Sequence, residues 1–247
     1  MEFGNFVSKS LLKRCIIHKK NKKSYADIQF GTIERPTYLP QVERWKEEHW
    51  DEKPRTIEPL QSYVTNGFGA GDLQIVTEAV REYQFIGEDY ARIAMTLYRS
   101  VPYLGKSDLH DRPGRESGTK VRTEGTRHMN ELIQARYYLR VLGNADDEYS
   151  CAQFAKEMLT PLIGYQAASF RNNTDEFVLS IADEMNLPLT HSLVEVEGEV
   201  VCSTIKKDSR GTIIRLYNPK RSDSAEARLN NKTIELKTCQ FDDLLVD

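Results

Sequence analysis

Arginine, aspartate and serine side chains gather near the middle of the sequence, in residues 104–118, which read LGKSDLHDRPGRESG. The candidate binding residues of this stretch are Asp108, Asp111, Arg112, Arg115 and Ser117. Because a guanidinium presents a planar fork of donors, two such arginines can hold vicinal hydroxyls or a carboxylate in fixed geometry. The alternative is that both arginines pair with Asp108, Asp111 or Glu116 and only hold the loop in shape.

Two predicted strands lead into this loop. Residues 81–86 and 93–101 alternate apolar and polar side chains and are separated by a short polar turn. The stretch that follows is rich in Gly, Asp, Arg and Pro, fits neither helix nor strand, and is typical of a long ordered loop. We therefore expect a sheet that presents an arginine-rich loop, which is a common way to build a polar site.

A family resemblance is carried by the same region. The motifs REYQFIGE, TLYRSV, YLGK-DL and RPGR, in this order and spacing, resemble the C-terminal β-region of glycoside hydrolase family 38, the α-mannosidases. They are most similar to the bacterial branch that includes mannosylglycerate hydrolase-like enzymes. YADIQFGTIERPTYLP, WDEKP and IEPLQSYV upstream, and EMLTP and LYNP downstream, extend the resemblance over roughly residues 24–240.

The resemblance implies an all-β fold. It predicts a large β-supersandwich of the galactose-mutarotase-like type over residues 24–189 and a small C-terminal β-sandwich over 190–247, with one or two short helices and an unmatched basic leader, 1–23. Family members carry the zinc ion and the aspartate nucleophile in an N-terminal α/β barrel, which this sequence does not match. The resemblance thus implies no catalytic residue, no metal and no cofactor in this chain, with zinc expected in the barrel.

The resemblance also implies partners. In the family, an arginine of the β-region reaches the sugar, and the RPGR motif is where we expect it, as Arg112 or Arg115. Asp108 and Ser117 are the accompanying polar residues. The expected partners are a mannose-containing carbohydrate and the catalytic barrel of an α-mannosidase.

Composition describes an ordinary soluble globular protein. The chain has 247 residues, of which 39% are hydrophobic and 29% charged, with a formal net charge of −3. This balance favours neither nucleic acid nor a membrane as partner, and no apolar run approaches the ~20 residues that span a bilayer. Without a recognisable secretory signal, and with four widely spaced cysteines and no CxxC pair, we expect a cytoplasmic protein with reduced thiols.

The first half of the chain is predicted as follows. Residues 1–23 carry seven Lys/Arg against one acid. They are either a basic arm for an acidic partner or a solvated leader. Leu11, Leu12, Ile16 and Ile17 could still form a strand or a helical turn. Residues 24–59 are expected to be an extended segment laid across a sheet, pinned by Phe30, Trp45 and Trp50, with a short helix at 45–48. Strands at 62–65 and 73–77 flank three glycines, which favour a hairpin turn over a phosphate loop because no long helix follows.

The second half of the chain contains apolar spacings of both the helical and the strand type. Residues 128–142 suit a helix or a strand, and the family resemblance favours a long strand. Residues 146–159 predict a helix capped by Asp146 or Asp147 and ended by Pro161. Short strands at 193–196, 200–205, 212–217, 225–229 and 233–236 then predict the small sandwich, with a domain boundary near residue 190.

Other constellations are interpreted as structural. The acid pairs Asp146-Asp147 and Asp242-Asp243 lie in turns or near a terminus and are expected to be surface charges rather than the paired acids of a glycosidase. His49 and Asp51 alone cannot form a tetrahedral zinc site. The aromatic residues Tyr83, Phe85, Tyr90, Tyr98 and Tyr103 suit a core better than a shallow sugar-binding face.

These observations lead to one main hypothesis. The chain is expected to be the C-terminal β-region of a retaining α-mannosidase, which scaffolds the catalytic domain, contributes to carbohydrate binding and is inactive alone. The alternatives are a stand-alone carbohydrate-binding or interaction module and a remnant of an interrupted gene. Apolar surface exposed where a barrel would dock predicts that the isolated chain can form homo-oligomers.

Overall fold

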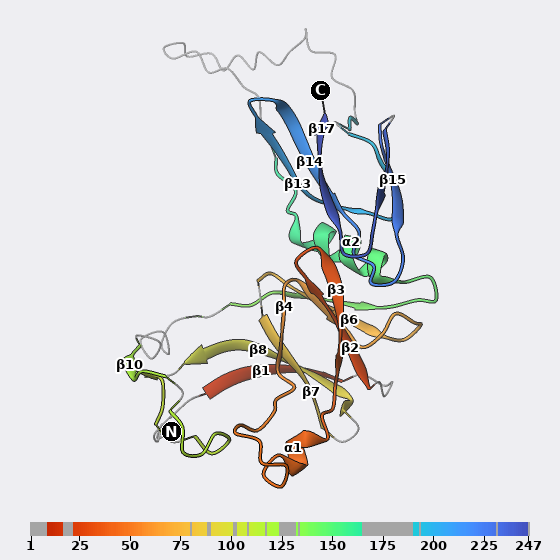
Figure 1. The fold of residues 1–247 in the computed structure, drawn as a ribbon. Coiled ribbons are helices and arrows are strands. Elements are labelled where there is room, and N and C mark those ends of the chain that lie inside the picture. Colours follow the sequence, from red (N-terminus) through yellow and green to blue (C-terminus); the bar gives the residue numbers. More distant parts are fainter. Residues whose placement is uncertain are drawn as a thin grey trace, which may run out of the picture.

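The computed structural model describes residues 9–16, 22–79, 81–87, 90–100, 103–107, 109–116, 118–123, 132, 134–164, 190–192, 194–230 and 232–246. Strands dominate, and the helices of the described part are α1 (Gln41–Arg44) and α2 (Glu148–Leu159). Figure 1 shows two groups of strands with α2 between them. The predicted all-β class is confirmed. No helix in the described part of the chain is long and apolar enough to cross a membrane.

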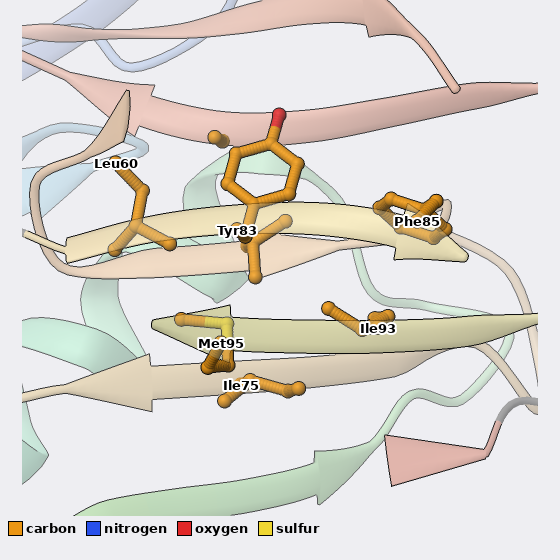
Figure 2. Packing of buried hydrophobic residues seen from close by; sticks show 8 residues of the cluster. Leu60, Ile75, Tyr83, Phe85, Ile93 and Met95 are labelled. Carbon is orange, nitrogen blue, oxygen red and sulfur yellow. The ribbon is translucent and has the colours of Figure 1, made fainter. Parts of the chain in front are cut away.

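The first group of strands is a sandwich of two antiparallel sheets. One sheet has the order β1-β8-β7-β4, with β1 (Lys9–Ile16), β8 (Arg92–Ser100), β7 (Arg81–Ile86) and β4 (Glu58–Leu60). The other has the order β11-β6-β5-β2-β3, with β11 (Tyr137–Val141), β6 (Leu73–Thr77), β5 (Tyr63–Thr65), β2 (Lys23–Ile28) and β3 (Gly31–Pro36). Side chains from both sheets meet in one buried cluster between them, which is the core of this sandwich (Figure 2).

The alternation in β7 explains how this core forms. Tyr83 and Phe85 point to the same face because neighbouring side chains of a strand point to opposite faces, and they are only 1% and 2% exposed. Their partners in β8, Met95 and Ile93, are fully buried. The predicted hairpin of residues 81–86 and 93–101 is therefore confirmed, and these two aromatic residues belong to the core, as expected.

The second group is a smaller sandwich. Its sheets have the orders β12-β15-β16 and β13-β14-β17, with β12 (Val196–Gly198), β15 (Ala225–Leu229), β16 (Lys232–Leu236), β13 (Val201–Asp208), β14 (Gly211–Tyr217) and β17 (Phe241–Val246). Ile214, Leu216 and Leu244 pack against Ala227 and Leu236 of the facing sheet. The expected strands of this part are found within a few residues of their predicted positions, and β17 is an addition.

Helix α2 lies between the sandwiches and contributes a third apolar cluster. Cys151, Ala152 and Ala155 of the helix pack with Tyr63 of β5 and with Val201 of β13. The helix begins where Asp147 forms a capping box: the Ser150 N–H donates to Asp147 Oδ1 at 2.8 Å, and the Asp147 N–H donates to Ser150 Oγ at 3.0 Å. Because α2 covers one face of β5 and β6, both faces of these strands are buried. The predicted cap at Asp147 is confirmed.

Residues 24–59 differ from the prediction of a single extended segment. They begin with the hairpin of β2 and β3, whose turn places Phe30 at a φ of 59°. The irregular mixture of polar and apolar residues conceals these strands, because side chains on both faces are partly buried. The helix predicted at 45–48 is α1, four residues earlier. Phe30 and Trp45 are packed as expected, whereas Trp50 is 47% exposed.

Other expectations are met in part. The leader contributes β1, which pairs with β8, so the strand alternative for residues 9–16 is found. The glycine-rich turn joins β5 and β6 in the predicted hairpin. Of the long strand predicted at 128–142, β11 occupies residues 137–141. Residues 132, 134–136 and 142 are described but belong to no strand, and residues 128–131 and 133 are outside the described part. The boundary near residue 190 adjoins residues 165–189, also outside it, and stays a prediction.

Candidate functional site

The arginine-rich loop is closed at its base by a short two-stranded ribbon. Strands β9 (Tyr103–Leu104) and β10 (Val121–Arg122) pair antiparallel. Gly105 follows β9 at a φ of 74°, and a Cβ there would lie 2.5 Å from the carbonyl oxygens of Gly118 and Thr119. Only glycine combines this backbone conformation with such a close approach. The pairing of β9 with β10 thus holds the two ends of the loop together.

The loop is anchored to the segment that follows α1. The Lys53 N–H donates to the Asp111 carbonyl at 2.8 Å, and the Asp111 carboxylate pairs with Arg55. A hydrogen bond from His110 lowers the pKa of Asp111, against the raising effect of burial, and the charges of Arg55 and Lys53 lower it further. Asp111 therefore stays ionised at neutral pH and serves as the anchor of the loop.

The two candidate arginines pair with the same segment. Arg115 Nη1 lies 3.1 Å from Asp51 Oδ2, and Arg112 Nε lies 3.7 Å from Glu52 Oε2. The acids expected as partners are different ones: neither Asp111 nor Glu116 forms an ion pair with these arginines within the residues described. Asp108 and Ser117, the other two predicted site residues, lie outside the described part of the chain.

An open hollow adjoins these pairs. It has a volume of about 650 Å³ and is lined by residues 49–55. The Trp50 N–H donates to the Trp45 carbonyl at 2.8 Å across His49, whose φ is 58°, a left-handed helix-end geometry. Trp45 is buried and anchors the turn, so the next tryptophan, Trp50, is held at the surface beside the hollow.

The arrangement suits binding of polar ligands. Guanidinium donors, carboxylate acceptors and a half-exposed indole lie within one short segment and one loop, and an exposed aromatic ring can contact the C–H face of a sugar. Sequence reasoning missed Asp51, Glu52 and Arg55 as site residues, although the WDEKP motif already marked this segment. Among the residues described, no group of three or more His, Cys, Asp or Glu side chains could hold a metal ion.

Fold and site define an all-β polypeptide of two sandwiches whose larger part presents an arginine-bearing loop. No protein-family model matches the sequence. A protein of Halalkalibacterium halodurans named "Putative mannosylglycerate hydrolase" is 24% identical over 215 residues, which are 85% of this chain and 20% of that protein.

Solved structures show the same fold. An α-mannosidase from Enterococcus faecalis V583 superposes with a TM-score of 0.61 at 15% identity, over 94% of this chain and 25% of that one. A glycosyl hydrolase family 38 protein from Enterococcus faecalis gives a TM-score of 0.57 at 15% identity, over 90% and 22%. The chain spans a fifth to a quarter of these relatives. The similarity to the C-terminal β-region of family 38 α-mannosidases is thereby confirmed.

Proposed function

We propose that this chain serves as the C-terminal β-region of a retaining α-mannosidase, in which it scaffolds the catalytic domain and contributes to binding of mannose-containing carbohydrate. In this proposal the zinc ion and the nucleophile belong to the catalytic domain. The isolated chain is then inactive.

The observation that carries the proposal is the docking of the arginine-rich loop onto the segment beside Trp50. Arg115 is held by a hydrogen bond of 3.1 Å to Asp51, and Arg112 lies 3.7 Å from Glu52 without a hydrogen bond to it; their side chains are 56% and 28% exposed. A held but accessible guanidinium loses little conformational entropy when it binds a hydroxyl or carboxylate. The neighbouring indole supplies an apolar surface for a sugar ring.

The ribbon at the base of the loop supports a contact with another domain. Tyr103, Leu104 and Val121 are 45%, 58% and 51% exposed on β9 and β10, which project to one side of the large sandwich (Figure 1). Apolar side chains clustered on an exposed ribbon favour protein–protein contact. In the proposal they are covered by the catalytic barrel, and in the isolated chain they can promote homo-oligomers.

The binding role is tested by calorimetric titration of the full chain with mannose and with mannosylglycerate. Arg115→Ala and Arg112→Ala should each weaken binding by about ten- to a hundredfold, since a hydrogen bond from a charged donor contributes roughly 1.5–3 kcal/mol. Arg210→Ala is the matched control, because Arg210 forms an exposed ion pair with Asp208 on the small sandwich. Equal binding by all three variants would remove the loop from the proposal.

The catalytic part of the proposal needs a separate measurement. The purified chain, supplied with zinc, should not hydrolyse a chromogenic α-mannoside. Turnover that is proportional to protein and survives repurification would contradict it. A stand-alone binding module is favoured instead if wild type binds sugar as tightly without a catalytic domain as with one.

A further inference from the structure

A second hollow lies at the junction of the two sandwiches, away from the arginine-rich loop. Its volume is about 280 Å³, and its walls come from several elements of the fold. Asp27 belongs to β2, Gln61 precedes β5, Lys156 belongs to α2 and Tyr217 ends β14. A molecule in this pocket would therefore touch both sandwiches and the helix between them.

The charged groups of this junction pocket are already engaged. Asp27 Oδ1 accepts hydrogen bonds from the N–H groups of Gln61, Ser62 and Tyr63 at 3.1, 2.6 and 3.1 Å, and Asp27 Oδ2 accepts from Ser62 Oγ at 2.5 Å. Lys156 Nζ donates to a backbone carbonyl of β13 at 3.0 Å. Asp27 is thus taken up by neighbouring donors, whereas Lys156 makes one such bond and keeps donors for the oxygens of a hydroxylated ligand.

The other polar groups of the pocket are neutral. Within the described residues, the side-chain amides of Gln29 and Gln61 and the hydroxyl of Tyr217 form no hydrogen bond, and all three residues line the pocket. Burial, and then the charge of Asp27, raise the pKa of Tyr217, so its hydroxyl stays protonated. Amides and a phenol can both donate and accept hydrogen bonds, which is the pattern that hydroxyl groups complement.

We propose that the junction pocket binds a neutral, polyhydroxylated ligand of monosaccharide size. Its volume lies just below the roughly 300–1,000 Å³ of usual ligand pockets, which suits one small ring better than an oligosaccharide. The Phe30 ring, 5.8 Å from the Tyr217 ring, gives the pocket an aromatic wall. The proposal does not depend on the function assigned to the arginine-rich loop.

Occupancy of the pocket has a structural consequence. Because the ligand contacts side chains from both sandwiches, it binds the assembled junction better than a separated one. Binding to the folded chain alone then raises its stability by mass action. A saturating ligand should therefore raise both the thermal midpoint and the resistance of the junction to proteolysis.

The test is a titration of the full chain with mannose, glucose and inositol, followed by calorimetry and by thermal unfolding. Wild type should bind at least one of them with a dissociation constant on the order of 1 mM. Tyr217→Phe and Gln61→Leu, which remove polar groups and keep bulk, should each weaken binding by about two- to tenfold. Arg210→Ala, whose side chain forms an exposed ion pair with Asp208, should leave it unchanged.

The variants distinguish ligand binding at the junction pocket from ligand binding at the arginine-rich loop. Arg115→Ala should weaken only binding at the loop, so saturable binding that keeps its affinity in Arg115→Ala and is weakened when Tyr217→Phe is added supports the junction pocket. Absence of saturable binding in Arg115→Ala, or binding indifferent to both Tyr217→Phe and Gln61→Leu, would show that the pocket holds only water and would overturn the inference.

Discussion

Arg221 is the residue whose loss should most weaken the contact between the sandwiches. It precedes β15, and its side chain reaches two acids of other elements: Nη1 lies 2.8 Å from Glu34 Oε2 of β3, and Nε lies 2.5 Å from Glu148 Oε1 of α2. The guanidinium also lies 4.7 Å from the centre of the Tyr25 ring of β2. One side chain thus connects three separate parts of the fold.

The size of the effect follows from burial. Glu148 is 8% exposed, so Arg221→Ala leaves its carboxylate buried with the Arg221 backbone N–H, at 2.7 Å, as a remaining partner. Removal of one member of a buried ion pair costs about 3–5 kcal/mol, and exposed pairs contribute about 0–1 kcal/mol. Because the Arg221 side chain is 31% exposed, we expect a loss of about 2–3 kcal/mol in the free energy of unfolding.

The assay is equilibrium unfolding in urea, with the double variant Arg221→Ala, Glu148→Gln to close a thermodynamic cycle. The coupling between the two side chains should be about 1–2 kcal/mol, since residues in one ion-pair network interact. Arg210→Ala is again the control and should change stability by less than about 0.5 kcal/mol. A loss below about 0.5 kcal/mol in Arg221→Ala, or no coupling to Glu148, would refute the reasoning.

Three further outcomes are expected. Alkylation at pH 8, followed by mass spectrometry, should modify exposed Cys239 and spare Cys151, because burial raises the pKa of Cys151 to about 12. Burial raises the pKa of Asp146, but hydrogen bonds and the charge of Arg140 outweigh burial and lower the pKa overall. The ionised Asp146 therefore stabilises the fold above the ordinary carboxyl pKa, and this stability is lost as the pH falls through the lowered pKa of the folded state. Asp146→Asn should make the free energy of unfolding less dependent on pH in the acid range. Phe85→Ala should cost about 3–5 kcal/mol in urea unfolding, and Leu139→Ala, at a 58% exposed position, less than about 0.5.

Local pattern predicts those elements whose burial is one-sided or whose ends carry a specific signal. β7 alternates because Tyr83 and Phe85 face the core, and Asp147 marks the start of α2 because a capping box needs an acceptor at that position. β17 escapes prediction because Asp243 stands inside it. That carboxylate is tolerated in the strand because Arg215 of the neighbouring strand β14 donates to it at 2.6 and 2.8 Å.

The sequence predicts only part of the candidate site. Residue types point to Arg112 and Arg115, since planar donors in an irregular loop favour a binding role. Their partners do not follow from the sequence, because Arg115 is 64 residues from Asp51 and no local rule connects the two. The surface position of Trp50 likewise depends on the left-handed residue His49, at a φ of 58°, which spacing alone does not reveal.

Helix α2 and Arg221 make the junction more than a contact between two independent sandwiches. The Gln74 side chain of β6 donates to the Cys151 carbonyl at 2.7 Å, and the buried cluster around α2 includes Val201 of β13. The proposed ligand pocket shares α2 with these contacts, so its affinity should depend on them. A ligand at 100 times its dissociation constant adds about 2.7 kcal/mol to wild type, and it should add less in Arg221→Ala, where separation of the sandwiches competes with binding. Equal gains in both proteins would mean that Arg221 does not control the geometry of the pocket.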